Sequence, residues 1–228
     1  KNKIKFIPLS NTISNRSYLS VLDNKGEMII GLANMDSYEK TKISKIIKEF
    51  NNKKIIFDLN LSLKIINFLV KKYSLNNTIC ICGTSAHKVY KIRNLLPKIN
   101  TLILNKQESL SLTNKKTIKD SLIYLIKRNN KLTIIITNGK NRLIAYHNKI
   151  IYSCKPPQIR TQNESGAGDV MSAVFNFFIT SHKFSEALIK SINAGSLQAA
   201  GYQTANKESY LQKIEQMSRR TQISKKNI

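Results

Sequence analysis

The stretch Asn163-Glu164-Ser165-Gly166-Ala167-Gly168-Asp169 stands directly before an apolar segment, Val170 to Ile179, that has the composition of a buried helix. Small residues at such a position let a ligand come close to the backbone. The first N–H groups of a helix lack intrahelical partners and, together with the helix dipole, they make a site for an anion. The sequence therefore predicts an anion-binding turn at Gly166, Ala167 and Gly168, with the Asp169 carboxylate in the same helical turn.

An anion site beside a carboxylate suits the transfer of a phosphoryl group to an alcohol. The amides would hold the charge of the migrating group, and Asp169 would accept the proton of the hydroxyl. The alternative is a plain capped helix start, because Ser and Asp are favoured there without any chemistry. The turn alone does not decide between the two, since short glycine motifs are weak signals.

Strands and helices alternate through the part of the chain that precedes this turn. Apolar runs of strand length recur at residues 53–59, 78–82, 101–104 and 132–137. Segments with the i, i+3, i+4 spacing of amphipathic helices are found at 62–73, 85–95, 107–112 and 117–129. This alternation implies right-handed βαβ crossovers and a parallel sheet covered on both faces, whose ligands bind at the carboxyl ends of the strands.

Two hairpins and a helical C-terminal part complete the pattern. One hairpin is expected from Ser17 to Ala33, and a second from Arg142 to Ser153 with Asn148-Lys149 at its turn. After the anion-binding turn, helices are expected at residues 167–181 and 184–201. The tail from Asn206 is polar and is expected to fray after Arg219. We expect a single domain over residues 1–228, because no linker divides the chain.

The net charge of +25, from 38 Lys and Arg against 13 Asp and Glu, would by itself suggest nucleic acid or another anionic surface as the partner. The positive residues are mostly Lys, spread among many Asn and Ile, and they lack the Arg and aromatic clustering of nucleic-acid grooves. A genome rich in A and T explains this excess, because these residues share AT-rich codons. Solvated faces are thus the favoured interpretation, and a nucleic-acid binder stays open as the alternative that the charge alone predicts.

Other bulk features point to an ordinary intracellular protein. No stretch approaches the roughly 20 apolar residues of a membrane span, and Lys1 to Ser10 has no signal-peptide pattern, so the expected location is the cytoplasm. Three cysteines, an odd number, favour free thiols: Cys80, Cys82 and Cys154. Cys80 and Cys82 share one face of an expected strand, and no His or Cys cluster near them completes a zinc set, so buried packing is their expected role.

Several motifs occur in an order that resembles the PfkB, or ribokinase-like, family. Gly166-Ala167-Gly168-Asp169, followed by a helix of small and apolar residues, resembles the signature of that family. Asn105-Lys106-Gln107-Glu108 resembles its Asn-x-x-Glu element, which in relatives organises Mg²⁺ and phosphate through water. Thr137-Asn138-Gly139 resembles the Thr-x-Gly turn that contacts nucleotide phosphates, and Asn193-Ala194 falls where relatives place small residues against adenine. The resemblance runs from about Ser17 to Thr204.

The resemblance implies a three-layer α/β/α sandwich with a mostly parallel sheet and a lid-like hairpin at 17–33. It also implies an ATP-dependent phosphotransferase that uses Mg²⁺. Asp169 would be the catalytic base, and the amides of Gly166, Ala167 and Gly168 the anion hole. The implied cofactor-binding residues are Asn105, Glu108, Thr137, Gly139, Ser165, Asn193 and Ala194, with Glu108 also holding the metal through water.

Within the family, pseudouridine kinases are the most similar branch. The segments that carry this likeness are Tyr18-Leu19-Ser20-Val21-Leu22-Asp23, Ala33-Asn34-Met35-Asp36 and Asp58-Leu59-Asn60-Leu61, and Asn163 before the glycines is also seen there. The implied reaction moves the γ-phosphate of ATP to the 5′-hydroxyl of pseudouridine. Tyr18 would face the nucleoside, and simple packing of a strand aromatic is the alternative.

The chain also departs from the family pattern. Relatives open with a strand that carries a substrate-binding Asp and then a Gly-Gly element, and neither precedes Lys1. Cys82-Gly83-Thr84-Ser85 stands where pseudouridine kinases tend to have Asp-Pro-x-Ser, and Glu164 is a charged neighbour for an anion site. The alternative to an active kinase is therefore a fragment of a longer kinase or a catalytically impaired nucleotide-binding paralogue. A homodimer is one way to cover the sheet edge that missing strands would leave.

Overall fold

The computed structural model describes residues 17–24, 28–34, 49–202 and 207–228. In this part of the chain the main sheet has seven strands in the order β3-β4-β5-β6-β7-β8-β9. Neighbouring strands are parallel from β3 to β6 and antiparallel from β6 to β9. The strands are β3 (Lys54–Phe57), β4 (Thr78–Cys82), β5 (Thr101–Asn105), β6 (Thr133–Thr137), β7 (Leu143–His147), β8 (Ile150–Cys154) and β9 (Ile223–Asn227).

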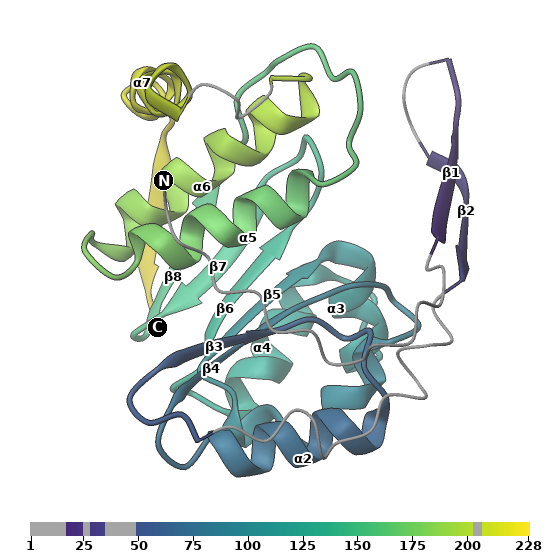
Figure 1. Ribbon diagram of the computed structural model, residues 1–228. Helices are drawn as coiled ribbons and strands as arrows, with labels where there is room; N and C mark the ends of the chain where they lie inside the picture. The colour runs from purple at the N-terminus through teal and green to yellow at the C-terminus, as the bar shows by residue number, and fades with distance from the viewer. Residues whose placement is uncertain (1–16, 25–27, 35–48, 203–206) are drawn as a thin grey trace.

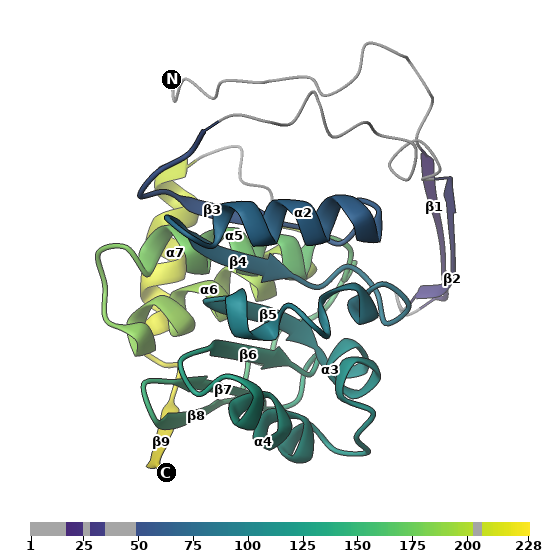
Figure 2. The ribbon, with the colours of Figure 1, turned by 90° about the horizontal axis from the view of Figure 1, so that it is seen from below.

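Helices cover both faces of this sheet. Figure 1 shows α2, α3 and α4 below the sheet and α5, α6 and α7 above it, and Figure 2 shows the same layers from another side. The helices are α2 (Leu63–Tyr73), α3 (Lys106–Thr113), α4 (Ile118–Arg128), α5 (Ala167–Phe178), α6 (Phe184–Ala199) and α7 (Lys207–Ser218). The expected three-layer α/β/α architecture with a mostly parallel sheet is therefore confirmed.

The core divides into two main apolar clusters, one on each face of the sheet. Alternation along β4 illustrates the division: Ile81 packs with the α2 and α4 side, whereas Cys80 packs with the α5 and α6 side. Full burial of one aliphatic side chain contributes about 1.5–3 kcal/mol, so these clusters are the main source of stability. They fix the strand ends, and with them the edge where ligands of such sheets bind.

One predicted helix, at residues 85–95, is wrong. The segment forms two short 3₁₀ helices instead, η2 (Val89–Ile92) and η3 (Leu96–Lys98). Pro97 cannot donate the backbone hydrogen bond that would continue an α-helix. The apolar spacing nevertheless serves the core, because Val89, Ile92 and Leu95 are buried there.

The C-terminal tail is folded, so the prediction that it frays after Arg219 is also wrong. Helix α7 packs on α6, where Ile214 is buried and the Tyr210 hydroxyl donates to the Ala194 carbonyl at 3.0 Å. Strand β9 then pairs with β8, from Cys154↔Ile223 to Ile150↔Asn227. Backbone hydrogen bonds to a free strand edge do not require apolar side chains, so a polar sequence can pair there.

The first predicted hairpin is present as β1 (Ser17–Leu22) and β2 (Met28–Asn34), beside the main body in Figures 1 and 2. Leu19 lies opposite Leu32, and Val21 lies opposite Ile30. These four side chains are exposed. A role of the hairpin as a lid stays a prediction.

Within the described residues, no helix is both long enough and apolar enough to cross a bilayer.

Candidate active site

The predicted anion-binding turn has the geometry that its sequence requires. Gly166 caps α5 with φ +77°, a left-handed conformation that glycine adopts without strain. The Asn163 side chain accepts from the Ser165 amide at 2.8 Å and so turns the chain toward the helix. The Ala167 amide, which was also predicted to bind the anion, instead donates to the Glu164 carbonyl at 3.2 Å. Among the described residues, no acceptor lies in hydrogen-bonding position for the amides of Gly166, Gly168 and Asp169. These amides are therefore available to an anion.

Helix α6 holds this turn from behind. A Cβ at Gly195 of α6 would lie 2.9 Å from the Ala167 carbonyl oxygen and 3.1 Å from the Met171 Cβ, so only glycine permits this close approach. The residues that lead into the turn are tied to the end of the same helix, because the amides of Gln162 and Asn163 both donate to the Ala199 carbonyl, at 2.7 and 3.1 Å. The anion-binding turn thus rests on a rigid helix pair.

A small cavity of about 80 Å³ opens beside the turn. Its walls bring together Gly168 and Asp169 of α5, Asn105 and Glu108 at the junction of β5 and α3, and Thr137 at the end of β6. The remaining walls are Gly83, Ile103, Leu104, Met171 and Ser172. Asp169 is exposed, and no ion pair of the described residues involves its carboxylate. The structure thus brings predicted site residues from four elements to one cavity.

Glu108 reaches this cavity from a capping box at the start of α3. Its amide donates to the Asn105 side chain at 2.9 Å, and its carboxylate oxygen Oε2 accepts from the Asn105 amide at 2.8 Å. Glu108 is only 4% exposed, and burial raises the pKa of its carboxyl above the ordinary value, against the opposite effect of the Asn105 amide. Gly83 lies against this carboxylate, and a Cβ there would force the carboxylate to move.

The donor atoms around this cavity fit a hydrated Mg²⁺ ion. Mg²⁺ prefers carboxylate and other hard oxygen ligands and keeps several of its waters. Glu108 and Asp169 offer carboxylates and Thr137 a hydroxyl on the same walls. No Lys or Arg in the described part of the chain pairs with the buried Glu108, so a bound cation would supply the missing positive charge.

Thr137 and Gly139 lie where the phosphate-contacting turn was predicted. Thr137 is paired with Asn105 in the parallel register of β5 and β6, so the two candidate motifs are neighbours at the carboxyl edge. Gly139 has φ +55°, and in the described part of the chain no atom lies within 4 Å of the place where its Cβ would stand. Its backbone is therefore open to a ligand.

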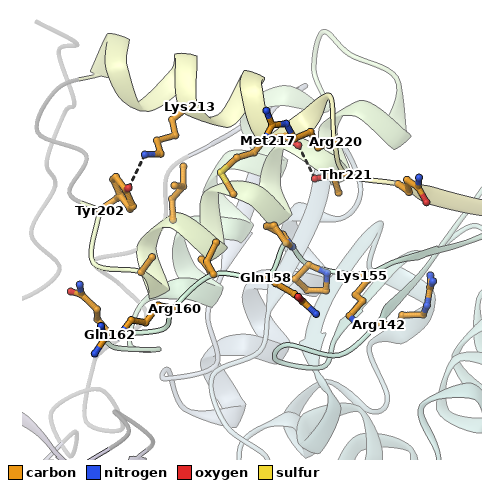
Figure 3. Close-up of a pocket in the computed structure, with 16 residues that line it drawn as sticks. Arg142, Lys155, Gln158, Arg160, Gln162, Tyr202, Lys213, Met217, Arg220 and Thr221 are labelled. Carbon is orange, nitrogen blue, oxygen red and sulfur yellow. Dashed lines mark hydrogen bonds between the residues drawn. The ribbon is translucent and has the colours of Figure 1, made fainter.

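A second cavity, of about 800 Å³, was missed by the sequence analysis (Figure 3). It lies between the loop at residues 155–162, the end of α6 and helix α7. Among the described residues, five cationic side chains and no acidic one belong to its lining: Arg142, Lys155, Arg160, Lys213 and Arg220. Lys213 donates to the Tyr202 hydroxyl at 2.7 Å and lies 4.1 Å from the centre of its ring. These residues are far apart in the sequence, so no short motif predicts the cavity.

Asn193 and Ala194, predicted to contact adenine, are not at this cavity in the structure. Both are fully buried. The Asn193 amide donates to the Ser218 hydroxyl at 3.1 Å and accepts from the Thr221 hydroxyl at 3.0 Å, so it fastens α6 to the end of α7. Leu197 and Ala200, further along the same stretch, line the cavity instead. The predicted contact of Asn193 and Ala194 with adenine is therefore not supported, and Asn193 instead joins two helices.

Tyr18 and Ser165 lie apart from the cavity walls. Tyr18 stands on β1 with 54% of its surface exposed, and its ring lies against Gly31 of β2. Ser165 is exposed in the anion-binding turn. Neither residue belongs to the lining of the two cavities.

Cys82, at the carboxyl end of β4, lies close to the site. The pKa of its thiol is lowered, mainly because Cys80 hydrogen-bonds to it, and Ser172 acts in the same direction. Burial and the carboxylates of Asp169 and Asp58 act in the opposite direction. Asp58, which follows β3, therefore shares the electrostatic neighbourhood of Cys82 with Asp169.

Solved structures share this architecture. The carbohydrate kinase from Agrobacterium tumefaciens is 22% identical, with a TM-score of 0.71 over 92% of this chain and 71% of that one. Phosphofructokinase-2 from Escherichia coli in complex with fructose-6-phosphate is 13% identical, with a TM-score of 0.62 over 78% of this chain and 59% of that one. A ribokinase from Thermotoga maritima is 10% identical, with a TM-score of 0.63 over 87% and 67%. At these identities the likeness shows the fold.

The family follows from the sequence profile. No curated protein matches the chain significantly. The profile described as pfkB family carbohydrate kinase matches residues 3–209, which is most of the chain. The chain therefore belongs to the pfkB family of carbohydrate kinases.

Proposed function

We propose that the chain is an ATP-dependent kinase that transfers the γ-phosphate to a hydroxymethyl group of a nucleoside or sugar, with pseudouridine as the acceptor and pseudouridine 5′-phosphate as the product. One observation carries this proposal. The open amides of the anion-binding turn, the exposed Asp169 carboxylate and the buried Glu108 carboxylate border a single cavity. Phosphoryl transfer needs such a set: donors for phosphate charge, an acceptor for a proton and a ligand for a metal ion.

Each group has a defined task in the transfer. The acceptor oxygen forms a bond to the γ-phosphorus while the bond from that phosphorus to the β,γ-bridging oxygen breaks, and ADP leaves. Asp169 takes the proton of the acceptor hydroxyl. The amides of Gly166, Gly168 and Asp169 hold the charge of the migrating group. Glu108 would hold Mg²⁺ through water, and the ion would neutralise phosphate charge.

The large cavity is the proposed place for the base and ribose of ATP. It is continuous along the chain with the anion-binding turn, because Gln162 lines it and the turn follows within a few residues. Its volume of about 800 Å³ falls in the range of small-molecule sites. Its cationic lining favours a ligand with phosphate groups.

The acceptor is proposed to lie on the side of β3 and β4. After β3, the Asp58 carboxylate accepts from the Asn60 amide at 3.0 Å and from its side chain at 2.8 Å, and Lys88 donates to the Asn60 side chain at 2.6 Å. This polar segment offers hydrogen-bonding groups to a ribose or a base. The choice of pseudouridine rests on the resemblance of Asp58-Leu59-Asn60-Leu61 and of the β1 segment to pseudouridine kinases.

A nucleotide-binding protein with impaired transfer is the second candidate. The observation that favours it is the capping box, because one carboxylate oxygen of Glu108 is already engaged by the Asn105 amide. Such a protein would bind ATP in the large cavity without handing on its phosphate.

A phosphoryl-transfer assay separates the candidates. ATP and Mg²⁺ are supplied with pseudouridine, uridine, ribose or fructose 6-phosphate, and ADP release and the phosphorylated product are measured together with ATP binding. We expect turnover with pseudouridine above the other acceptors. ATP binding without transfer to any acceptor would favour the second candidate, and absence of ATP binding would reject both.

A further inference from the structure

Cys80 and Cys82 place two thiols side by side beneath the candidate active site. Both side chains leave β4 on the face that packs against α5, whereas Ile81 between them packs on the opposite face. Both side chains belong to the same apolar cluster, and each thiol shifts the pKa of the other. Cys80 is 1% exposed and Cys82 is half-buried, so the pair is reached from the Cys82 side.

Polar groups of α5 surround this pair. The Asn176 Nδ2 lies 3.5 Å from the Cys80 Sγ. Ser172 lowers the pKa of the Cys82 thiol. Asn176 is 6% exposed, and its Oδ1 is a buried atom for which the described residues provide no hydrogen-bond partner. A buried amide oxygen without a partner costs stability, so its presence beside two thiols calls for a function.

The Asn176 side chain lies beside the Cys80 sulfur, and its amide plane can turn. Its Nδ2 also donates to the Ser172 carbonyl at 2.9 Å, which keeps the group beside the thiols. The terminal torsion of Asn is broad, so a rotation that gives up the bond to the Ser172 carbonyl exchanges the amide nitrogen and the oxygen. Asn176 can therefore face the pair as a donor to sulfur or as an oxygen ligand.

We propose that Cys80 and Cys82 form a two-thiol binding site for a soft monovalent cation, with Cu⁺ as the ion that fits. Thiolates select soft ions such as Cu⁺. A closed zinc site needs four ligands, and the described part of the chain contains no group of three or more His, Cys, Asp or Glu side chains that could hold a metal ion. Two sulfur ligands on one strand match an ion of low coordination number.

The charges of the neighbourhood balance the bound state. On binding, each thiol releases its proton to solvent and forms a bond from sulfur to the ion, with no change of oxidation state. Two thiolates and one Cu⁺ leave a net charge of minus one. Lys54 lies within electrostatic range of Cys80, and its ammonium donates to the Asn176 backbone carbonyl at 3.4 Å. Its positive charge can therefore offset the net negative charge of the bound state.

Occupation of this site reaches the proposed reaction through Cys82. Its sulfur lies within electrostatic range of Asp169, and Gly83, the next residue, lines the small cavity with Glu108. An ion fixed between the sulfurs therefore changes the field at the proposed base. This second effect rests on the proposed function, whereas ion binding itself does not.

The direct test is a Cu⁺ titration under anaerobic conditions, against a chromophoric Cu⁺ chelator, with the full chain. Wild type is expected to withdraw one equivalent from the chelator, and X-ray absorption is expected to report two sulfur neighbours. Cys80→Ser and Cys82→Ser should each lose this equivalent. Cys154→Ser is the matched control, because Cys154 is a buried free thiol that stands on β8, and it should bind as wild type does. Asn176→Ala should weaken binding about tenfold as the loss of a supporting group does.

Three results would overturn the site. They are Cu⁺ binding by Cys80→Ser or Cys82→Ser that equals that of wild type, loss of binding in Cys154→Ser, and a coordination shell without two sulfurs. Circular dichroism and thermal unfolding check that each variant folds. If Cys80→Ser does not fold, the Cu⁺ titration of Cys82→Ser is the test, because the Cys82 side chain is the less buried of the two. Turnover is measured separately with and without Cu⁺, so an inactive kinase that still binds the ion rejects the proposed function and leaves the site standing.

Discussion

The anion-binding turn and the large cavity differ in how the chain builds them. The turn is seven consecutive residues, 163–169, whose open backbone amides are the proposed anion site. The cavity is assembled from side chains between Arg142 and Gln222, and one of its walls is α7. A local backbone site can be read from a short stretch of sequence, whereas a cavity between packed elements exists only after they have docked. The two regions should therefore respond differently to mutation.

The largest expected effect is at the turn itself. Asp169→Asn should lower kcat by about 10²–10⁴, the usual contribution of a general base, and should leave ATP binding in place. Initial rates and a nucleotide-binding titration measure the two quantities. Glu164→Gln, an exposed acid of the same turn, is the control and should keep its activity. Unchanged turnover in Asp169→Asn would remove this carboxylate from the chemistry.

The next largest effect is expected from a substitution that disturbs the large cavity and leaves the turn intact. Ile214→Ala removes a fully buried side chain from the contact of α7 with α6, and such a deletion costs about 2–5 kcal/mol where the site cannot collapse. We expect a raised KM for ATP with kcat little changed, because α7 walls the cavity and does not reach the small one. Leu211→Ala, on the exposed side of the same helix, should do far less. An equal fall of kcat would show that the two regions are not separable.

A smaller effect tests how α6 supports the turn. Gly195→Ala sets a methyl group 2.9 Å from the Ala167 carbonyl, and backbone cannot yield as a flexible side chain can. Overpacking of this kind costs about 1–3 kcal/mol. Urea unfolding should report this loss, and kcat should fall because the amides shift. Ser196→Ala on the same helix is the control. A stability equal to wild type would mean that the close approach is not required.

The smallest effect is a pH dependence at Glu108. Its pKa is raised in the folded protein by burial, so its contribution to stability is present at low pH and is lost as the pH rises through that raised pKa. Glu108→Gln keeps an acceptor for the capping box and removes the ionisation. Between pH 4 and pH 8 the unfolding free energy of wild type should therefore fall relative to that of the variant. Glu186→Gln, at an exposed site, should show no such trend.

Regular elements with strong local signals could be predicted from the sequence. Strand β4 was predicted with its bounds, Thr78–Cys82, and the turn of the β7–β8 hairpin at Asn148 and Lys149 has the positive φ values, 48° and 63°, of such a turn. The start of α5 directly after the glycines was predicted as well, and anion binding there stays a prediction. Local propensity and periodicity decide these features.

The features that were missed depend on tertiary contacts. Strand β9 has the polar sequence Ile-Ser-Lys-Lys-Asn and forms because β8 offers an edge. The large cavity needs the docking of α7, and Asn193 proved to be a clamp inside the helix layer because Ser218 and Thr221 satisfy its amide. A short motif cannot say whether its polar side chain will face a ligand or another helix.

The Asn193 clamp has a consequence for local unfolding. Because Thr221 stands between α7 and β9, the helix cannot leave α6 without loosening the pairing of β9 with β8. The two elements should then open together as one cooperative unit. A nucleotide bound against α7 favours the closed form and should slow hydrogen exchange of the β9 amides, although no residue of β9 lines the cavity. Exchange at the edge of the sheet would thus report occupancy at a distance.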